Sequence, residues 1–123
     1  MKILIIEDDP FFRNYFSSKL RESGFLVETA VDGQEGLKKI KTIKPDLVLL
    51  DIIMPNKDGF EVLTTMNSNP TNNPIPVIVF STLGQEDDVK KAINLGAKDY
   101  INKSFFDFNK ILEKINHQLN IKK

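Results

Sequence analysis

The chain has 123 residues, of which 41% are hydrophobic and 28% are charged. This size and composition predict one globular domain, residues 1–123, with a buried core. The absence of cysteine excludes disulfides and thiol chemistry, and is compatible with a reducing cytoplasm. Because 17 basic and 17 acidic residues give a formal net charge of +0, direct nucleic-acid binding is disfavoured. No apolar run has the length of a signal peptide core or a membrane span, so membrane insertion is not expected.

Five short apolar runs alternate with longer amphipathic stretches along the chain. We predict strands at 3–6, 25–28, 47–50, 76–80 and 99–102. Most of these runs are rich in Val, Ile and Leu and show no polar alternation. That pattern is typical of strands that are buried on both faces of a sheet.

The stretches between the runs have helical periodicity. The first helix should begin with Asp9 as N-cap and Pro10 in its first turn, and should end near Gly24. The second helix should begin near Asp32 and the third near Gly59. The fourth should end at Gly96, and the last should begin at about Phe108. Their apolar faces are predicted at Phe12, Phe16 and Leu20; Leu37 and Ile40; Phe60 and Leu63; Val89, Ala92 and Ile93; and Phe108, Ile111, Leu112, Ile115 and Leu119.

Alternating strands and helices predict an α/β fold, in which right-handed crossovers build a doubly wound parallel sheet covered by helices on both faces. Ligands bind such sheets outside the carboxyl ends of the strands. The residues that follow each predicted strand are Glu7, Asp8 and Asp9; Glu28 and Thr29; Asp51; Ser81 and Thr82; and Lys103. Each has an ordinary interpretation alone, such as a solvated turn, an N-cap or a surface lysine. Together they place several acids, two hydroxyls and one lysine at one edge of the sheet.

Such a concentration of acids needs positive charge nearby. Two carboxylates about 4 Å apart repel each other by about 4 kcal/mol at an effective dielectric constant of 20. Mg²⁺ takes one or two carboxylates together with water and phosphate oxygens, and Lys103 supplies a second positive charge. This arrangement suits phosphoryl transfer, with Asp51 as the nucleophile that forms an acyl phosphate.

With these residues placed, the chain resembles a receiver domain of the two-component response regulators, of the single-domain chemotaxis-regulator type. The matching motifs are IIEDDP, LLDIIMPNKDGFEVL, VIVFST and LGAKDYINK, which occur in the family's order and spacing. The resemblance covers essentially the whole chain. It implies a flavodoxin-like fold with five parallel strands in the order 2-1-3-4-5 and five helices.

The resemblance also assigns roles by position. It implies that Asp51 is the phosphoacceptor, that Ser81 and Lys103 contact the phosphoryl group, and that Ser81 and Tyr100 form a switch. The implied Mg²⁺ ligands are Glu7 (through water), Asp8, Asp51 and the backbone carbonyl of Ile53. The side chains that tune the lifetime of the phosphoryl group would be Ile53, Leu83 and Thr82.

The sequence departs from the family pattern at two places. Ser104 stands where the family usually has a proline after the lysine, so we predict a trans Lys103–Ser104 bond. Ile53 and Leu83 are both apolar, from which we hypothesise slow self-dephosphorylation.

The implied function is a cytoplasmic signalling switch and not an enzyme with an external substrate; its only chemistry would be Mg²⁺-dependent self-phosphorylation and slow self-dephosphorylation. A sensor histidine kinase or a phosphotransfer protein would supply the phosphoryl group. The fourth helix, the strand at 99–102 and the last helix would then dock on a downstream protein target.

Four other interpretations make different demands on the sequence. A receiver-like interaction module that is not phosphorylated stays open. A flavodoxin-like flavin site lacks its expected phosphate loop, because the loop after the first strand is acidic. A haloacid-dehalogenase-like phosphatase would need an Asp-x-Asp pair there. A DNA-binding regulator would need an effector domain, and only Asn120–Lys123 follow the last predicted helix.

Overall fold

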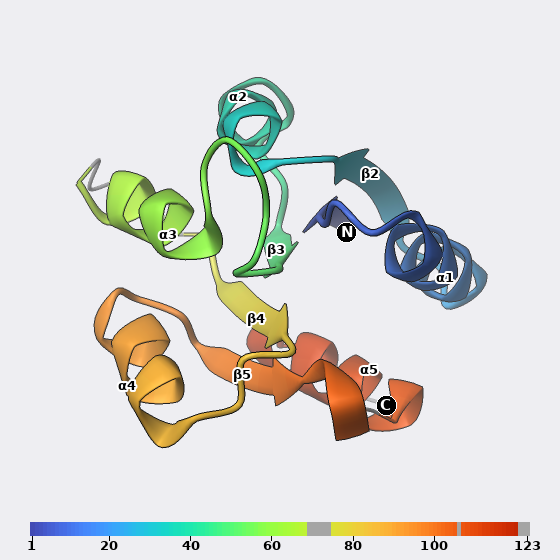
Figure 1. Ribbon diagram of the computed structural model, residues 1–123. Helices are drawn as coiled ribbons and strands as arrows, with labels where there is room; N and C mark the ends of the chain where they lie inside the picture. Colours follow the sequence, from blue (N-terminus) through green and yellow to red (C-terminus); the bar gives the residue numbers. More distant parts are fainter. Residues whose placement is uncertain (69–74, 106, 121–123) are drawn as a thin grey trace.

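The computed structural model describes residues 1–68, 75–105 and 107–120, and shows the five parallel strands that the sequence predicts. Their bounds are β1 Lys2–Ile6, β2 Leu26–Ala30, β3 Leu47–Leu50, β4 Val77–Ser81 and β5 Asp99–Asn102. They form one sheet in the order β2-β1-β3-β4-β5 (Figure 1). This confirms the predicted fold class and strand order. The sequence predicts that only Asn120–Lys123 follow the last helix, and residues 121–123 of this stretch lie outside the described residues.

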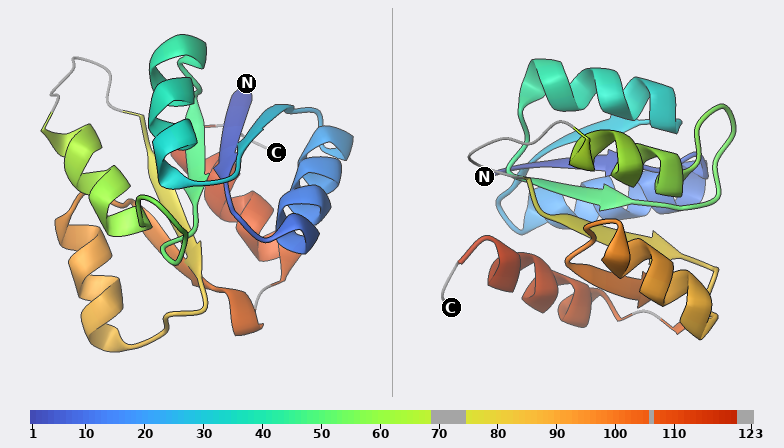
Figure 2. Two further views of the ribbon diagram at one scale, coloured as in Figure 1. Left: turned by 45° about the horizontal axis from the view of Figure 1, so that its top comes forward. Right: turned by 90° about the vertical axis from the view of Figure 1, so that its left-hand side faces the viewer.

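Five helices cover the two faces of the sheet. They are α1 Pro10–Glu22, α2 Gly33–Ile43, α3 Gly59–Asn67, α4 Glu86–Asn94 and α5 Phe108–Gln118, with a short 3₁₀ turn, η1, at Lys103–Phe105. Helices α1 and α5 lie on one face, and α2, α3 and α4 lie on the other (Figure 2). Asp9 caps α1 as predicted, because its side chain accepts a hydrogen bond from the backbone N–H of Phe11.

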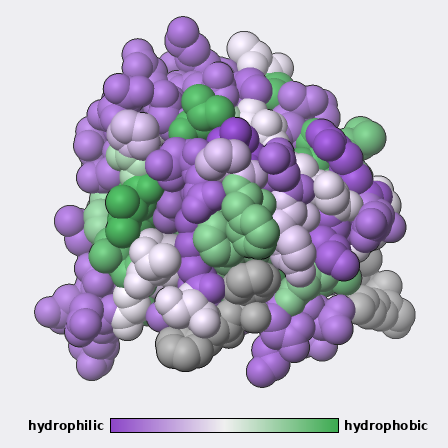
Figure 3. Space-filling model, turned by 45° about the vertical axis from the view of Figure 1, so that its right-hand side comes forward, coloured by the Kyte–Doolittle hydropathy of each residue, from purple (hydrophilic) through white to green (hydrophobic). Residues whose placement is uncertain are grey.

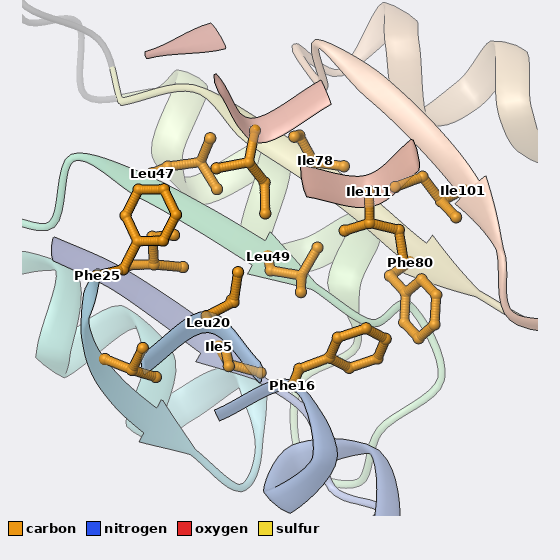
Figure 4. Packing of buried hydrophobic residues seen from close by; sticks show 13 residues of the cluster. Ile5, Phe16, Leu20, Phe25, Leu47, Leu49, Ile78, Phe80, Ile101 and Ile111 are labelled. Carbon is orange, nitrogen blue, oxygen red and sulfur yellow. The ribbon is translucent and has the colours of Figure 1, made fainter. Parts of the chain in front are cut away.

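Each face of the sheet has its own hydrophobic cluster. Under α1 and α5, side chains of alternate strand positions pack with the helices, and the rings of Phe16 and Phe80 meet edge to face at 4.7 Å (Figure 4). Residues at the intervening strand positions, such as Leu4 and Val48, face α2, α3 and α4. The predicted apolar face of the last helix is confirmed, since its residues all belong to or pack against the first cluster.

Two details of the elements differ from the sequence prediction. The second strand is Leu26–Ala30 instead of 25–28; Phe25 packs into the core just before it, and Leu26 stays 64% exposed because β2 is an edge strand. On α4, Ala92 is buried but Ile93 is 44% exposed. This helix lies over β5, the other edge strand, so the sheet covers only a narrow strip of it.

On the side of the molecule that carries α1, the surface is mostly hydrophilic with separate hydrophobic patches (Figure 3). Among the described residues, the exposed large hydrophobic side chains are Met1, Phe11, Leu26, Val31, Ile53 and Ile93. Within the described ranges, no helix is both long enough and apolar enough to cross a membrane.

Candidate functional site: an acidic cluster with a buried lysine

Three carboxylates gather at the carboxyl ends of β1 and β3. These strands pair in parallel with Ile6 opposite Leu50, so the residues that follow them lie side by side. Carboxylate oxygens of Glu7, Asp8 and Asp51 lie within 4.8 Å of one another. Glu7 and Asp51 are 3% and 5% exposed, whereas Asp8 is open to solvent. The predicted convergence of these acids is therefore present in the fold.

Lys103 is buried between two of these acids. Its Nζ lies 2.5 Å from Glu7 Oε1 and 3.1 Å from Asp51 Oδ2. It reaches the site from the end of β5, which is two strands away from β3 in the sheet. The ammonium also lies over two aromatic rings, at 4.7 Å from the centroid of Phe12 and 5.6 Å from that of Phe80.

The buried part of this cluster holds two carboxyl groups and only one ammonium. Burial raises the pKa of Glu7 to about 8, and the charge of Asp51 acts in the same direction, whereas the hydrogen bond with Lys103 opposes the shift. Burial by itself would lower the pKa of Lys103, but the hydrogen bond with Glu7 and the charge of Asp51 raise it overall. Lys103 therefore stays charged. Two carboxylates share this one cation, so the site favours a proton or an added cation.

The donor set fits a hard divalent cation. All three clustered side chains offer carboxylate oxygens, which are the ligands that Mg²⁺ prefers, and the exposure of Asp8 leaves room for coordinated water. No nitrogen or sulfur ligand joins the cluster among the described residues, which argues against a zinc-type site.

The loop from Asp51 to Asp58 is held at both ends. Near its start, the backbone N–H of Ile53 donates to Asp51 Oδ1 at 3.4 Å. At its end, a Cβ on Gly59 would lie 2.5 Å from the carbonyl oxygen of Asp51, so only glycine permits α3 to begin this close to β3. In the middle, the Asn56 side chain donates to Asp32 Oδ2 at 2.7 Å, and Asp32 also caps α2.

The predicted switch residues meet in the loop after β4. Ser81 is the last residue of β4 and is fully buried, and its hydroxyl accepts a hydrogen bond from the N–H of Leu83 at 3.2 Å. The Tyr100 hydroxyl donates to the carbonyl of the same Leu83. Burial raises the pKa of Tyr100, while contact with the Ser81 side chain works in the opposite direction. Thr82 points to solvent.

The serine after Lys103 makes a backbone hydrogen bond that a proline could not make. The Lys103–Ser104 bond is trans, since cis peptide bonds are absent from the described part of the chain. The N–H of Ser104 donates to Asn102 Oδ1 at 2.8 Å, and proline has no N–H to donate. The Asn102 side chain thus supports the turn that directs Lys103 into the site.

The predicted site residues lie in two neighbouring groups. The structure brings together Glu7, Asp8, Asp51 and Lys103, and it places Ser81, Leu83 and Tyr100 in one neighbouring loop region. Asp9 is not part of the cluster, because its carboxylate caps α1. The aromatic contacts of Lys103 do not follow from the sequence, because the spacing of Phe12 predicts only a place on the core face of the first helix and gives no sign of a cation beside it.

Comparison with known protein families and relatives agrees with this geometry. The family model described as "Response regulator receiver domain" matches residues 3–116. The chemotaxis protein CheY of Treponema pallidum is 40% identical over 117 residues, which cover 93% of this chain and 79% of that protein. The CheY of Listeria monocytogenes is 41% identical, over 85% of this chain and 87% of that protein.

Other relatives are longer proteins. The DNA-binding transcriptional regulator RpaA of Synechocystis is 38% identical over 85% of this chain, but the chain spans only 43% of its length. The response regulator RR06 of Streptococcus pneumoniae is 40% identical, and the chain spans 47% of it.

Solved structures share the whole fold. The BeF₃-activated receiver domain of Klebsiella pneumoniae RstA superposes with a TM-score of 0.88 at 28% identity, covering 97% of this chain and 98% of that one. A two-component response regulator from Clostridium difficile gives a TM-score of 0.90 at 26% identity, covering 98% and 96%.

Proposed function

The chain belongs to the response regulator receiver domain family, and from this premise we propose that it is a phosphorylation-dependent switch with Asp51 as its phosphoacceptor. The general function of this family in two-component systems is a phosphorylation switch. One observation supports the assignment to Asp51 above all others. Its carboxylate is shared between the acidic cluster and the ammonium of Lys103, 3.1 Å away.

The proposed chemistry is transfer of a phosphoryl group to a carboxylate. An oxygen of Asp51 attacks the phosphorus atom, a new O–P bond forms, and the bond from phosphorus to the donor atom breaks. The leaving group is the imidazole of a phosphohistidine, or acetate when acetyl phosphate is the donor. Lys103 is already within hydrogen-bond distance of Asp51, so it can pair with a phosphoryl oxygen and neutralise part of its charge.

Mg²⁺ is the cation we propose for this site, held by Asp8 and Asp51, by Glu7 through water, and by the backbone carbonyl of Ile53. When bound, it would neutralise charge on the phosphoryl oxygens. The surplus negative charge of the buried cluster supports this assignment.

The proposed signal passes through Ser81 and Tyr100. Both are linked to Leu83 in the loop before α4, so a shift of Ser81 toward a phosphoryl group would change the surroundings of Tyr100. The surface formed by α4, β5 and α5 would then bind a downstream protein target. A histidine kinase or phosphotransfer protein would be the donor, and we place this exchange in the cytoplasm. In this proposal residues 1–123 act as one receiver unit, with no external substrate.

A direct test distinguishes the phosphorylated switch from the alternative, an interaction module that is never phosphorylated. The wild type and Asp51→Asn are incubated with acetyl phosphate, with and without Mg²⁺, and their intact masses are measured. We expect the mass of one phosphoryl group on the wild type only, and only with Mg²⁺. A wild type that gains no mass, and whose NMR spectrum does not respond to beryllofluoride, would favour the unphosphorylated module.

A further inference from the structure

The surroundings of Lys103 are unusual for a lysine beside two acids. Two carboxylates take its hydrogen bonds, at 2.5 and 3.1 Å. The faces of Phe12 and Phe80 lie within 4.7 and 5.6 Å of the same nitrogen. The side chain of Lys103 is only 6% exposed, so these rings have little competition from water. A cation within about 6 Å of a ring centroid is attracted by the ring, and more strongly when it is desolvated.

The two rings come from two different elements of the fold, a helix and a central strand. Phe12 lies in the first turns of α1, directly after the acidic loop, and Phe80 lies in β4 next to Ser81. Their centroids are 5.7 Å apart with the planes at 72°, so each ring supports the other. Phe80 is 2% exposed and packs on Phe16, which ties the pair to the main core.

We propose that Phe12, backed by Phe80, is a positioning residue that holds the Lys103 ammonium where it can meet the phosphoryl group. The role toward the phosphoryl group rests on the proposed function, whereas the contact between the rings and the ammonium does not. Lys103 enters from a 3₁₀ turn that has a serine at position 104, and its long side chain has many rotamers. The rings limit those rotamers, so the ammonium stays at the site when Asp51 becomes esterified.

The inference predicts different effects on two ligands. Mg²⁺ and Lys103 compete for the carboxylates of Glu7 and Asp51, so loosening Lys103 should leave Mg²⁺ affinity unchanged or raise it. Beryllofluoride, which stands in for the phosphoryl group on Asp51, needs the ammonium in place and should bind more weakly. General damage to the fold would weaken both ligands together.

The test compares Phe12→Leu, Phe12→Tyr and Phe25→Leu. Phe25 lies in the same hydrophobic cluster but at the opposite end from Phe80 (Figure 4), so Phe25→Leu makes the same chemical change away from the lysine. The first readout needs no ligand: ring currents shift the proton resonances of the Lys103 side chain, which are assigned with Lys103→Met. These shifts should move in Phe12→Leu and stay in Phe25→Leu.

The second readout is beryllofluoride affinity and the rate of phosphorylation by acetyl phosphate, measured beside Mg²⁺ affinity. We expect a loss of about 3- to 10-fold in the first two for Phe12→Leu, from the usual strength of a cation–ring contact. Phe12→Tyr should restore both, and Mg²⁺ binding should not weaken in Phe12→Leu.

Unchanged Lys103 shifts in Phe12→Leu, or an equal loss in Phe25→Leu, would overturn the proposal. If the wild type took up neither beryllofluoride nor phosphoryl group, the proposed function would fail, and the Lys103 shifts would still decide whether the ring of Phe12 lies beside the lysine.

Discussion

Replacing Asp51 with asparagine should stabilise the unliganded protein, although it removes one partner of a buried ion pair. The change is nearly isosteric, and the asparagine oxygen can still accept from Lys103 in the place of Oδ2, whereas the amide nitrogen in the place of Oδ1 cannot accept the long 3.4 Å hydrogen bond from the N–H of Ile53. What is lost is a negative charge in a cluster of three carboxylates and one ammonium.

The magnitude follows from the distances. At an effective dielectric constant of about 20, Lys103 at 3.1 Å attracts the Asp51 charge by about 5 kcal/mol. Where Glu7 is ionised, above its pKa of about 8, its oxygen no more than 4.8 Å away repels the Asp51 charge by at least about 3.5 kcal/mol. Asp8 adds a smaller repulsion, because it is exposed and screened. These terms nearly cancel, so the cost of burying the Asp51 charge decides the sign, and we expect a net stabilisation of about 1–2 kcal/mol.

The assay is urea denaturation above pH 8, where Glu7 is ionised, first with EDTA and then with Mg²⁺. In EDTA, Asp51→Asn should have a higher urea midpoint than the wild type. Added Mg²⁺ should stabilise the wild type more than the variant, so the difference between their midpoints should become smaller. Asp58→Asn is the matched control: it makes the same change at the N-cap of α3, where Asn and Asp cap equally well. Lower stability of Asp51→Asn in EDTA would refute the reasoning that the cluster carries surplus negative charge.

Three further predictions follow from the same site. The fold raises the pKa of Glu7 from 4.5 to about 8, so protonation of Glu7 stabilises the folded protein. This contribution to the free energy of unfolding is fully present below about pH 4.5 and is lost as the pH rises through about 8. Without Mg²⁺, Glu7→Gln should therefore flatten the curve of unfolding free energy against pH in this range. Gly59→Ala should destabilise the fold by about 1–3 kcal/mol in urea denaturation, because its Cβ would meet the Asp51 carbonyl oxygen at 2.5 Å. Ile53→Asn and Leu83→Glu should each speed the loss of the phosphoryl group from purified phosphoprotein, and unchanged decay in both would count against slow self-dephosphorylation in the wild type.

The sequence was sufficient for the fold because its signals are local and agree with one another. The unbroken apolar runs of β1, β3 and β4 indicate buried parallel strands, and residues after parallel strands must share one edge of the sheet. The shared edge predicts that Glu7 and Asp51 lie close together although they are 44 residues apart in the sequence.

The sequence was insufficient where packing between distant side chains decides the outcome. Phe12 fits a helical core stripe, and the pattern does not show that Lys103 ends above its ring. The pairing of Asn102 with Ser104 likewise depends on the backbone of the turn after β5. Exposure of Ile93 follows from the position of α4 over an edge strand, which periodicity along one helix does not report.

The central claim is that Asp51 itself receives the phosphoryl group, and one measurement tests it most directly. The protein is phosphorylated with acetyl phosphate and Mg²⁺, the acyl phosphate is reduced with borohydride, and peptide mass spectrometry locates the residue converted to homoserine. We predict conversion at Asp51 alone, with Glu7 and Asp8 unmodified. Conversion at another acid while Asp51 stays intact would contradict the account.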